Sequence, residues 1–132
     1  MPIELEMFLR LLLAAALGAG IGFQRERAGK SAGIRTYSLI CIGSALFTIV
    51  SALGFLGADP SRIAAGIVVG IGFLGAGTIM RRGEGILEGL TTAATIWVVA
   101  GIGLAAGAGM YVITPVATAI VFIILYIPHP KD

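Results

Sequence analysis

The chain has 132 residues, of which 58% are hydrophobic and only 12% are charged, and its mean hydropathy is +1.01. Because soluble domains carry about 25% charged residues, this composition excludes a soluble globule and indicates an integral membrane protein of one domain. The net charge of +2 is small and spread over short segments, which favours contact with anionic lipid headgroups and not with nucleic acid.

Apolar segments of membrane-crossing length follow one another along the chain. A helix rises about 1.5 Å per residue, so about 20 apolar residues cross the hydrocarbon core. The uncharged stretch between Glu88 and Lys131 is too long for one crossing and fits two helices joined by a tight turn near Gly107. We therefore predict an all-α polytopic membrane protein, a single transmembrane domain over residues 1–132 with helices at 5–23, 36–57, 63–80, 89–106 and 110–127.

The basic residues predict how these helices are oriented. Lys and Arg accumulate in short cytoplasmic loops because moving them across a bilayer is costly. With five crossings, seven of the nine basic residues fall on one side, namely Arg25, Arg27, Lys30, Arg35, Arg81, Arg82 and Lys131. Only Arg62 lies clearly on the other side, and Arg10 is ambiguous. We predict that the N-terminus is outside and the C-terminus cytoplasmic. The chain opens with acidic and not basic residues, so the first helix is expected to be retained and not cleaved as a signal peptide.

The segment between the first two predicted helices has the highest charge density of the chain, and we interpret it as a regulatory or partner-binding loop. Its candidate residues are Arg25, Glu26, Arg27, Lys30, Arg35 and Thr36. Two other interpretations stay open. Glu26 precedes Lys30 by four residues, so the segment could extend the first helix with an ion pair. Attraction to anionic lipid also accounts for its charge without any protein partner.

Small residues recur at helical spacing and predict close helix packing. Gly70 to Gly75 matches the dinucleotide-binding pattern by letter, but residues 64–80 are continuously apolar, which does not fit the strand and soluble helix that the pattern requires. Small residues four apart instead let membrane helices approach closely. The candidate packing positions are Gly18, Gly22, Gly66, Gly70, Gly72, Gly75, Gly77, Thr91 and Thr92. Alternatively, the glycines of the third helix could interrupt it and expose carbonyls to an ion path.

No confident metal site, cofactor or catalytic residue emerges from the sequence. The second to fifth predicted helices contain no Asp or Glu, and Mg²⁺ is normally held by carboxylates. Glu26 and Asp59 are the candidates for a cation contact, although Asp59 before Pro60 is also typical of a helix start. Cys41 is the only cysteine and predicts a packing residue. We expect a protein that is not an enzyme, because no nucleophile–base pair or His cluster is present.

Several motifs in one order resemble those of the MgtC/SapB family of bacterial inner-membrane proteins. They are the segments Arg25 to Arg27, Ala32 to Thr36, Asp59 to Arg62, Gly70 to Gly77 and Gly89 to Trp97. The resemblance implies a multi-pass protein of the bacterial inner membrane linked to adaptation to low magnesium and to virulence, with inhibition of the F-type ATP synthase by some members. Many members continue into a cytoplasmic C-terminal domain, so the resemblance implies a short form that lacks it.

The chain also departs from the family pattern at several positions. The family often has an acidic residue at the position of Gln24, a His or Asn at Tyr37, and a Gln at Gly66. Each difference removes a polar group that a cation path could use. We therefore favour a non-enzymatic membrane regulator that acts by helix packing with itself and with a membrane partner such as the F-type ATP synthase. The alternative is a homo-oligomeric transporter or channel for Mg²⁺ or another small cation.

Overall fold

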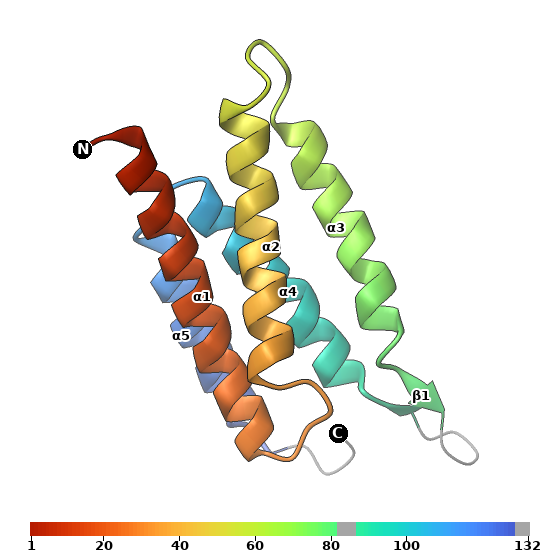
Figure 1. The fold of residues 1–132 in the computed structure, drawn as a ribbon. Helices are drawn as coiled ribbons and strands as arrows, with labels where there is room; N and C mark the ends of the chain where they lie inside the picture. The colour runs from red at the N-terminus through yellow and green to blue at the C-terminus, as the bar shows by residue number, and fades with distance from the viewer. Residues whose placement is uncertain (82–86, 129–132) are drawn as a thin grey trace.

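The computed structural model describes residues 1–81 and 87–128, and this part of the chain forms five α-helices and one short β-hairpin (Figure 1). The helices are α1 (Ile3–Arg27), α2 (Ile34–Leu53), α3 (Ser61–Ala76), α4 (Leu90–Gly107) and α5 (Ile113–Leu125). Strands β1 (Met80–Arg81) and β2 (Leu87–Glu88) pair antiparallel between α3 and α4. The prediction of five helices in an all-α fold is confirmed. Arg82 and Lys131, two of the basic residues used to predict the orientation, lie outside the described residues.

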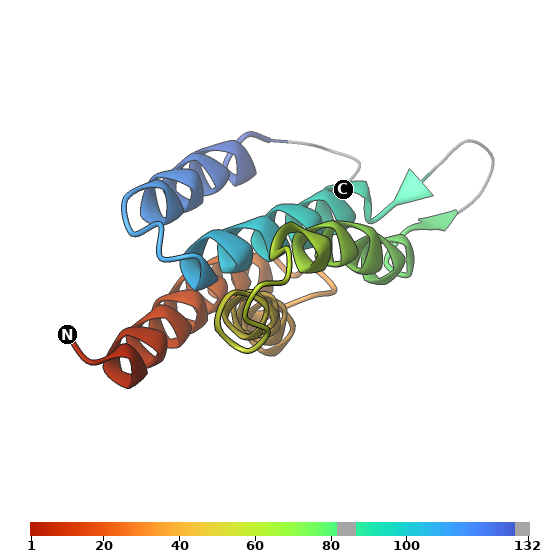
Figure 2. The same ribbon diagram turned by 90° about the horizontal axis from the view of Figure 1, so that it is seen from above.

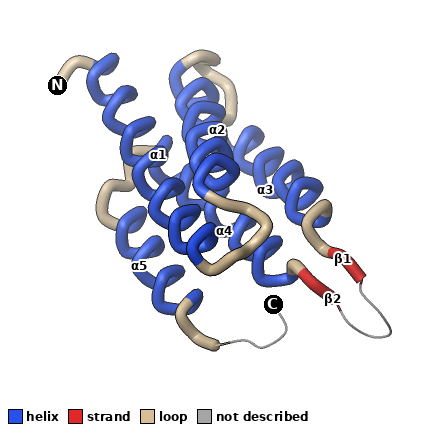
Figure 3. Tube along the Cα trace, turned by 60° about the horizontal axis from the view of Figure 1, so that its bottom comes forward, coloured by secondary structure: helices blue, strands red, loops and turns tan. Residues whose placement is uncertain are grey.

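Consecutive helices run up and down, so the connections alternate between two ends of the bundle (Figure 1). The loop of residues 28–33 and the two strands lie at one end, which we call the basic end (Figure 3). The N-terminus, the loop of residues 54–60 and the turn of residues 108–112 lie at the opposite end. The start of α1 and the end of α5 therefore lie at opposite ends of the bundle.

Helices α2 and α4 form the centre of the bundle. Helix α2 packs against α1 on one side and α4 on the other, while α3 and α5 lie against α4 at the periphery (Figure 2). Glycines make the central contacts close. A Cβ added at Gly18 would lie 2.7 Å from the Tyr37 carbonyl oxygen, and one added at Gly103 would lie 2.9 Å from Ser44 Cβ. The helix backbones therefore meet where a side chain is missing.

Three helices, α1, α2 and α4, are long and apolar enough to cross a membrane by length and composition. Helices α3 and α5 are apolar but have only 16 and 13 residues. The predicted helix at 63–80 ends earlier, because the chain turns after Gly77 and Thr78 Oγ1 donates a hydrogen bond to the Gly75 carbonyl at 2.7 Å. The predicted helix at 110–127 is shorter in the structure, where α5 begins at Ile113 and ends at Leu125.

The ends of the first and second helices also differ from the prediction. The second helix ends at Leu53 and not at residue 57, where Gly57 takes a φ of 83°. The first helix continues to Arg27, beyond the predicted end at residue 23. The first helix is therefore extended through Arg25, Glu26 and Arg27, while the predicted ion pair of Glu26 with Lys30 stays a prediction.

The contact between α2 and α4 generates a prediction about Gly103. In a helix interior Ala is more stable than Gly by about 1 kcal/mol. Apart from its chain neighbours and its own helix backbone, no described atom lies within 4 Å of a Cβ added at Gly101. Gly101→Ala should therefore raise the free energy of unfolding by about that amount. Gly103→Ala should instead lose about 1–3 kcal/mol, because its methyl group would overlap Ser44 and the Cys41 carbonyl. Thermal unfolding of both variants in one detergent measures the difference. Equal shifts in the same direction would contradict the close packing.

Candidate functional site

Arg25 lies on the buried stripe of α1 near the basic end. The buried residues of this helix are Ala14, Gly18, Ile21, Gly22 and Arg25. Their spacing of three and four residues places them on one face, so the arginine continues the face that packs against the other helices. Its side chain is only 3% exposed. The sequence placed Arg25 in a cytoplasm-facing loop, whereas the structure directs it into the bundle.

Arg25 binds a threonine in the first turn of α4. Arg25 Nη2 donates a hydrogen bond of 2.8 Å to Oγ1 of Thr92, which is itself 3% exposed. Gly89 precedes α4 with a φ of 87°, and this left-handed residue lets the chain leave β2 and enter the helix. Removing a guanidinium from water is costly, and hydrogen bonds to a charged group offset part of that cost. The contact ties α1 to α4.

The remaining charged residues of the predicted loop face outward. Glu26, Arg27, Arg35 and Thr36 are exposed, and Lys30 is half-buried. The guanidinium carbon of Arg27 lies 5.6 Å from the centre of the Phe23 ring, a cation–π distance that holds the side chain along the outside of α1. Glu26 Oε1 accepts a hydrogen bond of 3.4 Å from the Ile34 amide at the start of α2. Because Arg25 is buried, fewer of the predicted loop residues are available for a partner at the basic end than the sequence indicated.

A second polar cluster lies at the opposite end. Arg10 Nη2 forms an ion pair of 3.2 Å with Glu6 Oε1, and Arg10 Nη1 donates a hydrogen bond of 2.9 Å to the Gly107 carbonyl. Tyr111 donates to the same Glu6 oxygen at 2.9 Å. Desolvation and, after it, the hydrogen bond to Glu6 raise the pKa of Tyr111. The spacing of Glu6 and Arg10 signals their ion pair, but nothing local in the sequence points to Gly107 or Tyr111.

The two candidate cation ligands lie far from each other. Glu26 is at the basic end, whereas Asp59 is in the loop of residues 54–60 at the opposite end (Figure 1). Asp59 Oδ1 accepts hydrogen bonds from the amide and hydroxyl of Ser61, at 3.0 and 2.7 Å, and these bonds lower the pKa of Asp59. Within residues 1–81 and 87–128 no group of three or more His, Cys, Asp or Glu side chains could hold a metal ion.

The candidate packing residues fall into three groups. Gly18 and Gly22 face the start of α2, Gly75 meets Ala93 of α4, and Thr92 binds Arg25. Gly66, Gly70 and Gly72 of α3 have no described atom within 4 Å of an added Cβ apart from their chain neighbours and their own helix backbone. In the third group, Gly77 lies beside the Leu74 carbonyl, and the Thr91 carbonyl accepts a hydrogen bond from Thr95. Helix α3 is continuous through its glycines, so the interrupted helix considered from the sequence is not what the structure contains.

These apolar helices, with charge gathered at their ends, define a helical integral membrane protein. The chain belongs to the MgtC family, whose model matches residues 11–131.

Curated relatives come from several bacteria. The chain is 48% identical to the protein named putative magnesium transporter YhiD of Escherichia coli (strain K12), over 94% of this chain and 61% of that protein. It is 42% identical to Protein SapB of Bacillus subtilis (strain 168), over 83% and 50% of the two chains. It is 49% identical to Protein MgtC of Salmonella typhimurium (strain LT2), over 86% and 48%. The chain thus spans about half to two thirds of these relatives. No solved structure matches it significantly.

The hydrogen bond between Arg25 and Thr92 predicts a specific loss of stability. Thr92→Val keeps the shape of the side chain but removes the acceptor from a buried charged donor, so the free energy of unfolding should fall by about 1.5–3 kcal/mol. Thr95→Val is the matched control. Thr95 is equally buried, but its hydroxyl donates within its own helix to the Thr91 carbonyl, so that variant should lose about 1 kcal/mol or less. Denaturant unfolding in detergent measures both values, and equal losses would contradict the role of Thr92.

Proposed function

We propose that this chain is a non-enzymatic regulator of the bacterial inner membrane that serves adaptation to low magnesium by packing against membrane partners. Membership in the MgtC family supports this proposal, as do relatives that carry the names MgtC and putative magnesium transporter. The magnesium connection comes from these names and from the family resemblance. The packing mechanism comes from the interior of the bundle.

The observation that carries the proposal is the way interior hydroxyl groups are used. Ser44 Oγ donates a hydrogen bond of 2.6 Å to the Ala100 carbonyl across the contact between α2 and α4. Thr95 and Thr118 each donate to a carbonyl four residues back in their own helix. A donating hydroxyl keeps its lone pairs, but these interior groups are neutral, whereas Mg²⁺ prefers carboxylates. Such an interior suits a packed helical unit better than a conduction path.

We further propose that all five helices cross the membrane, with the basic end in the cytoplasm. At about 1.5 Å per residue, the helical parts of α3 and α5 cover about 24 and 20 Å, less than a hydrocarbon core of about 30 Å. Flanking apolar residues and local thinning of the bilayer can make up this difference at modest cost. Exposed apolar side chains such as Val69, Phe73 and Ile123 fit contact with lipid.

The basic end would then contact the regulated partner through Arg27 and Arg35, with Glu26 and Thr36 beside them. The partner is lipid or a membrane protein, and the family resemblance suggests the F-type ATP synthase. Self-association belongs to the same proposal, since Gly72 on the outer face of α3 would admit a close neighbour.

The regulator proposal predicts that charge at the basic end matters for growth in low magnesium. A Lys or Arg near an anionic surface contributes about 1 kcal/mol to the binding free energy. Replacing both Arg27 and Arg35 by Gln should therefore lower the affinity for the partner about thirtyfold. Growth of a strain that depends on this chain should then fail in low magnesium while membrane insertion is unchanged. The double replacement by Lys, which keeps the charge, should restore growth. Normal growth of the Gln variant would contradict the assignment.

The name of the Escherichia coli relative favours the transporter alternative. A measurement of Mg²⁺ flux into liposomes distinguishes a transporter from a regulator. Purified chain in liposomes with an entrapped magnesium indicator should show no flux above empty vesicles if the chain is a regulator. Glu26→Gln and Asp59→Asn are the variants to compare, since these are the two candidate carboxylates. A saturable Mg²⁺ flux that either variant abolishes would reverse the ranking of the two functions.

A further inference from the structure

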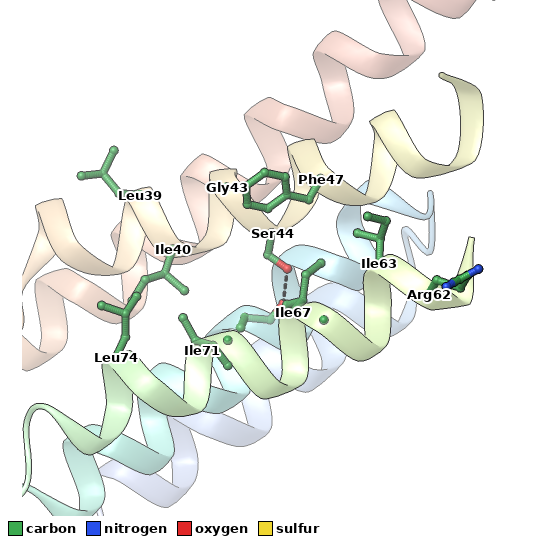
Figure 4. A pocket seen from close by; sticks show the side chains of 13 residues that line it. Leu39, Ile40, Gly43, Ser44, Phe47, Arg62, Ile63, Ile67, Ile71 and Leu74 are labelled. Atoms are coloured by element: carbon green, nitrogen blue, oxygen red, sulfur yellow. Dashed lines mark hydrogen bonds between the residues drawn. The ribbon is translucent and has the colours of Figure 1, made fainter. Parts of the chain in front are cut away.

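An elongated apolar groove separates α2 from α3. Its volume is about 490 Å³, and Figure 4 shows isoleucine, leucine and phenylalanine side chains from both helices around it. The groove exists because α3 leans on α4 more than on α2. Gly66 and Gly70 also lie along it without side chains to fill it, and no atom of the described chain lies within 4 Å of a Cβ added at either position.

The length of the groove matches one leaflet of a bilayer. The lining residues of α3 extend from Arg62 to Leu74, a rise of about 18 Å at about 1.5 Å per residue. Half of a hydrocarbon core of about 30 Å is about 15 Å. An occupant that enters beside Arg62 therefore reaches the middle of the membrane at the far end of the groove.

The dimensions of the groove suit an acyl chain. A single hydrocarbon chain is about 4 to 5 Å across, as contacts of about 4 Å between carbon atoms require, and fills about 300 Å³ over the length of the groove. This is less than the groove volume of about 490 Å³. The short connection of residues 54–60 holds α2 and α3 together at the end beside Arg62. A helix of a second copy, about 10 Å across, would enter this open groove only with the side chains of one face, whereas an acyl chain enters it whole.

The end of the groove carries a positive charge. Arg62 stands beside Ile63 at this end, in the first turn of α3, and is exposed (Figure 4). The nearest acid in the sequence, Asp59, is engaged by Ser61. Among the described residues no carboxylate lies within ion-pair distance of Arg62. A guanidinium in this position suits a phosphate group at the membrane surface.

We propose that this groove is a binding site for one glycerophospholipid, with an acyl chain between α2 and α3 and its phosphate held by Arg62. The site differs from general lipid contact because its occupant lies between two helices and is anchored by one charge. It goes beyond the proposed regulatory function and rests only on the proposed crossing of the membrane by α3, since no magnesium or partner enters the argument.

The test uses the full chain, purified and stripped of lipid in detergent, and native mass spectrometry to count bound lipid. Wild-type chain should bind one phosphatidylethanolamine or phosphatidylglycerol molecule tightly. Gly66→Leu and Gly70→Leu fill the groove and should each weaken this binding at least tenfold. Val69→Phe is the matched control, because it adds bulk at an exposed position of the same helix that does not line the groove. It should bind like the wild type.

The phosphate contact has its own pair of variants. Arg62→Gln should weaken phospholipid binding about tenfold but leave binding of phosphate-free diacylglycerol unchanged. Arg81→Gln removes the same charge from an exposed site at the basic end and should change neither. Equal binding by the Gly70→Leu and Val69→Phe variants would overturn the proposal, as would equal affinity of wild-type chain for phospholipid and diacylglycerol. Groove variants that change the oligomer size and not the lipid count would assign the groove to a second copy and also overturn it.

Discussion

The close approach of α2 to the helices on either side is the contact on which the rest of the structure depends. Lipid tails are as apolar as leucine side chains, so helices in a bilayer gain little by burying apolar surface against each other. They gain dispersion contacts if their backbones can come close. Gly18 on α1 and Gly103 and Gly107 on α4 allow this, because each meets backbone atoms of α2 directly. The order of the central layer, α1 then α2 then α4, follows from where these glycines occur.

Two arginines then hold α1 against α4 at the ends of this layer. Arg25 reaches Thr92 at the basic end, and Arg10 reaches the Gly107 carbonyl at the opposite end. Arg10 and Arg25 are about 22 Å apart along α1, and Thr92 and Gly107 are the same distance apart along α4, at about 1.5 Å per residue. The two helices are antiparallel, so the two contacts set a single register. The charge of Arg10 also lies at the C-terminus of α4, where a helix dipole favours a cation.

This arrangement leaves α3 at the periphery, and that position explains much of its character. Gly75 is the buried residue of this helix, and its other small residues open onto the groove or the outer surface. A helix with one buried residue leaves most of its surface available to meet something outside the chain. The basic end has a different surface from α3. Its exposed side chains are charged, and they lie at the well-packed end of α1 and the start of α2. Helix α3 can therefore contact lipid while the basic end contacts a partner.

Composition and the spacing of charges determined the membrane class, the number and order of the helices, and the gathering of basic residues at one end. These properties follow from local hydropathy, which does not depend on neighbours. Only the tertiary structure decided that Arg25 points inward to Thr92, that Arg10 binds Gly107, and that Gly103 and not Gly101 carries the close contact. Helices that are apolar on all sides carry no stripe in their sequence to mark the packed face. The partner of a polar group or a glycine is then set by helices distant in the sequence, and it becomes visible only when the helices are assembled.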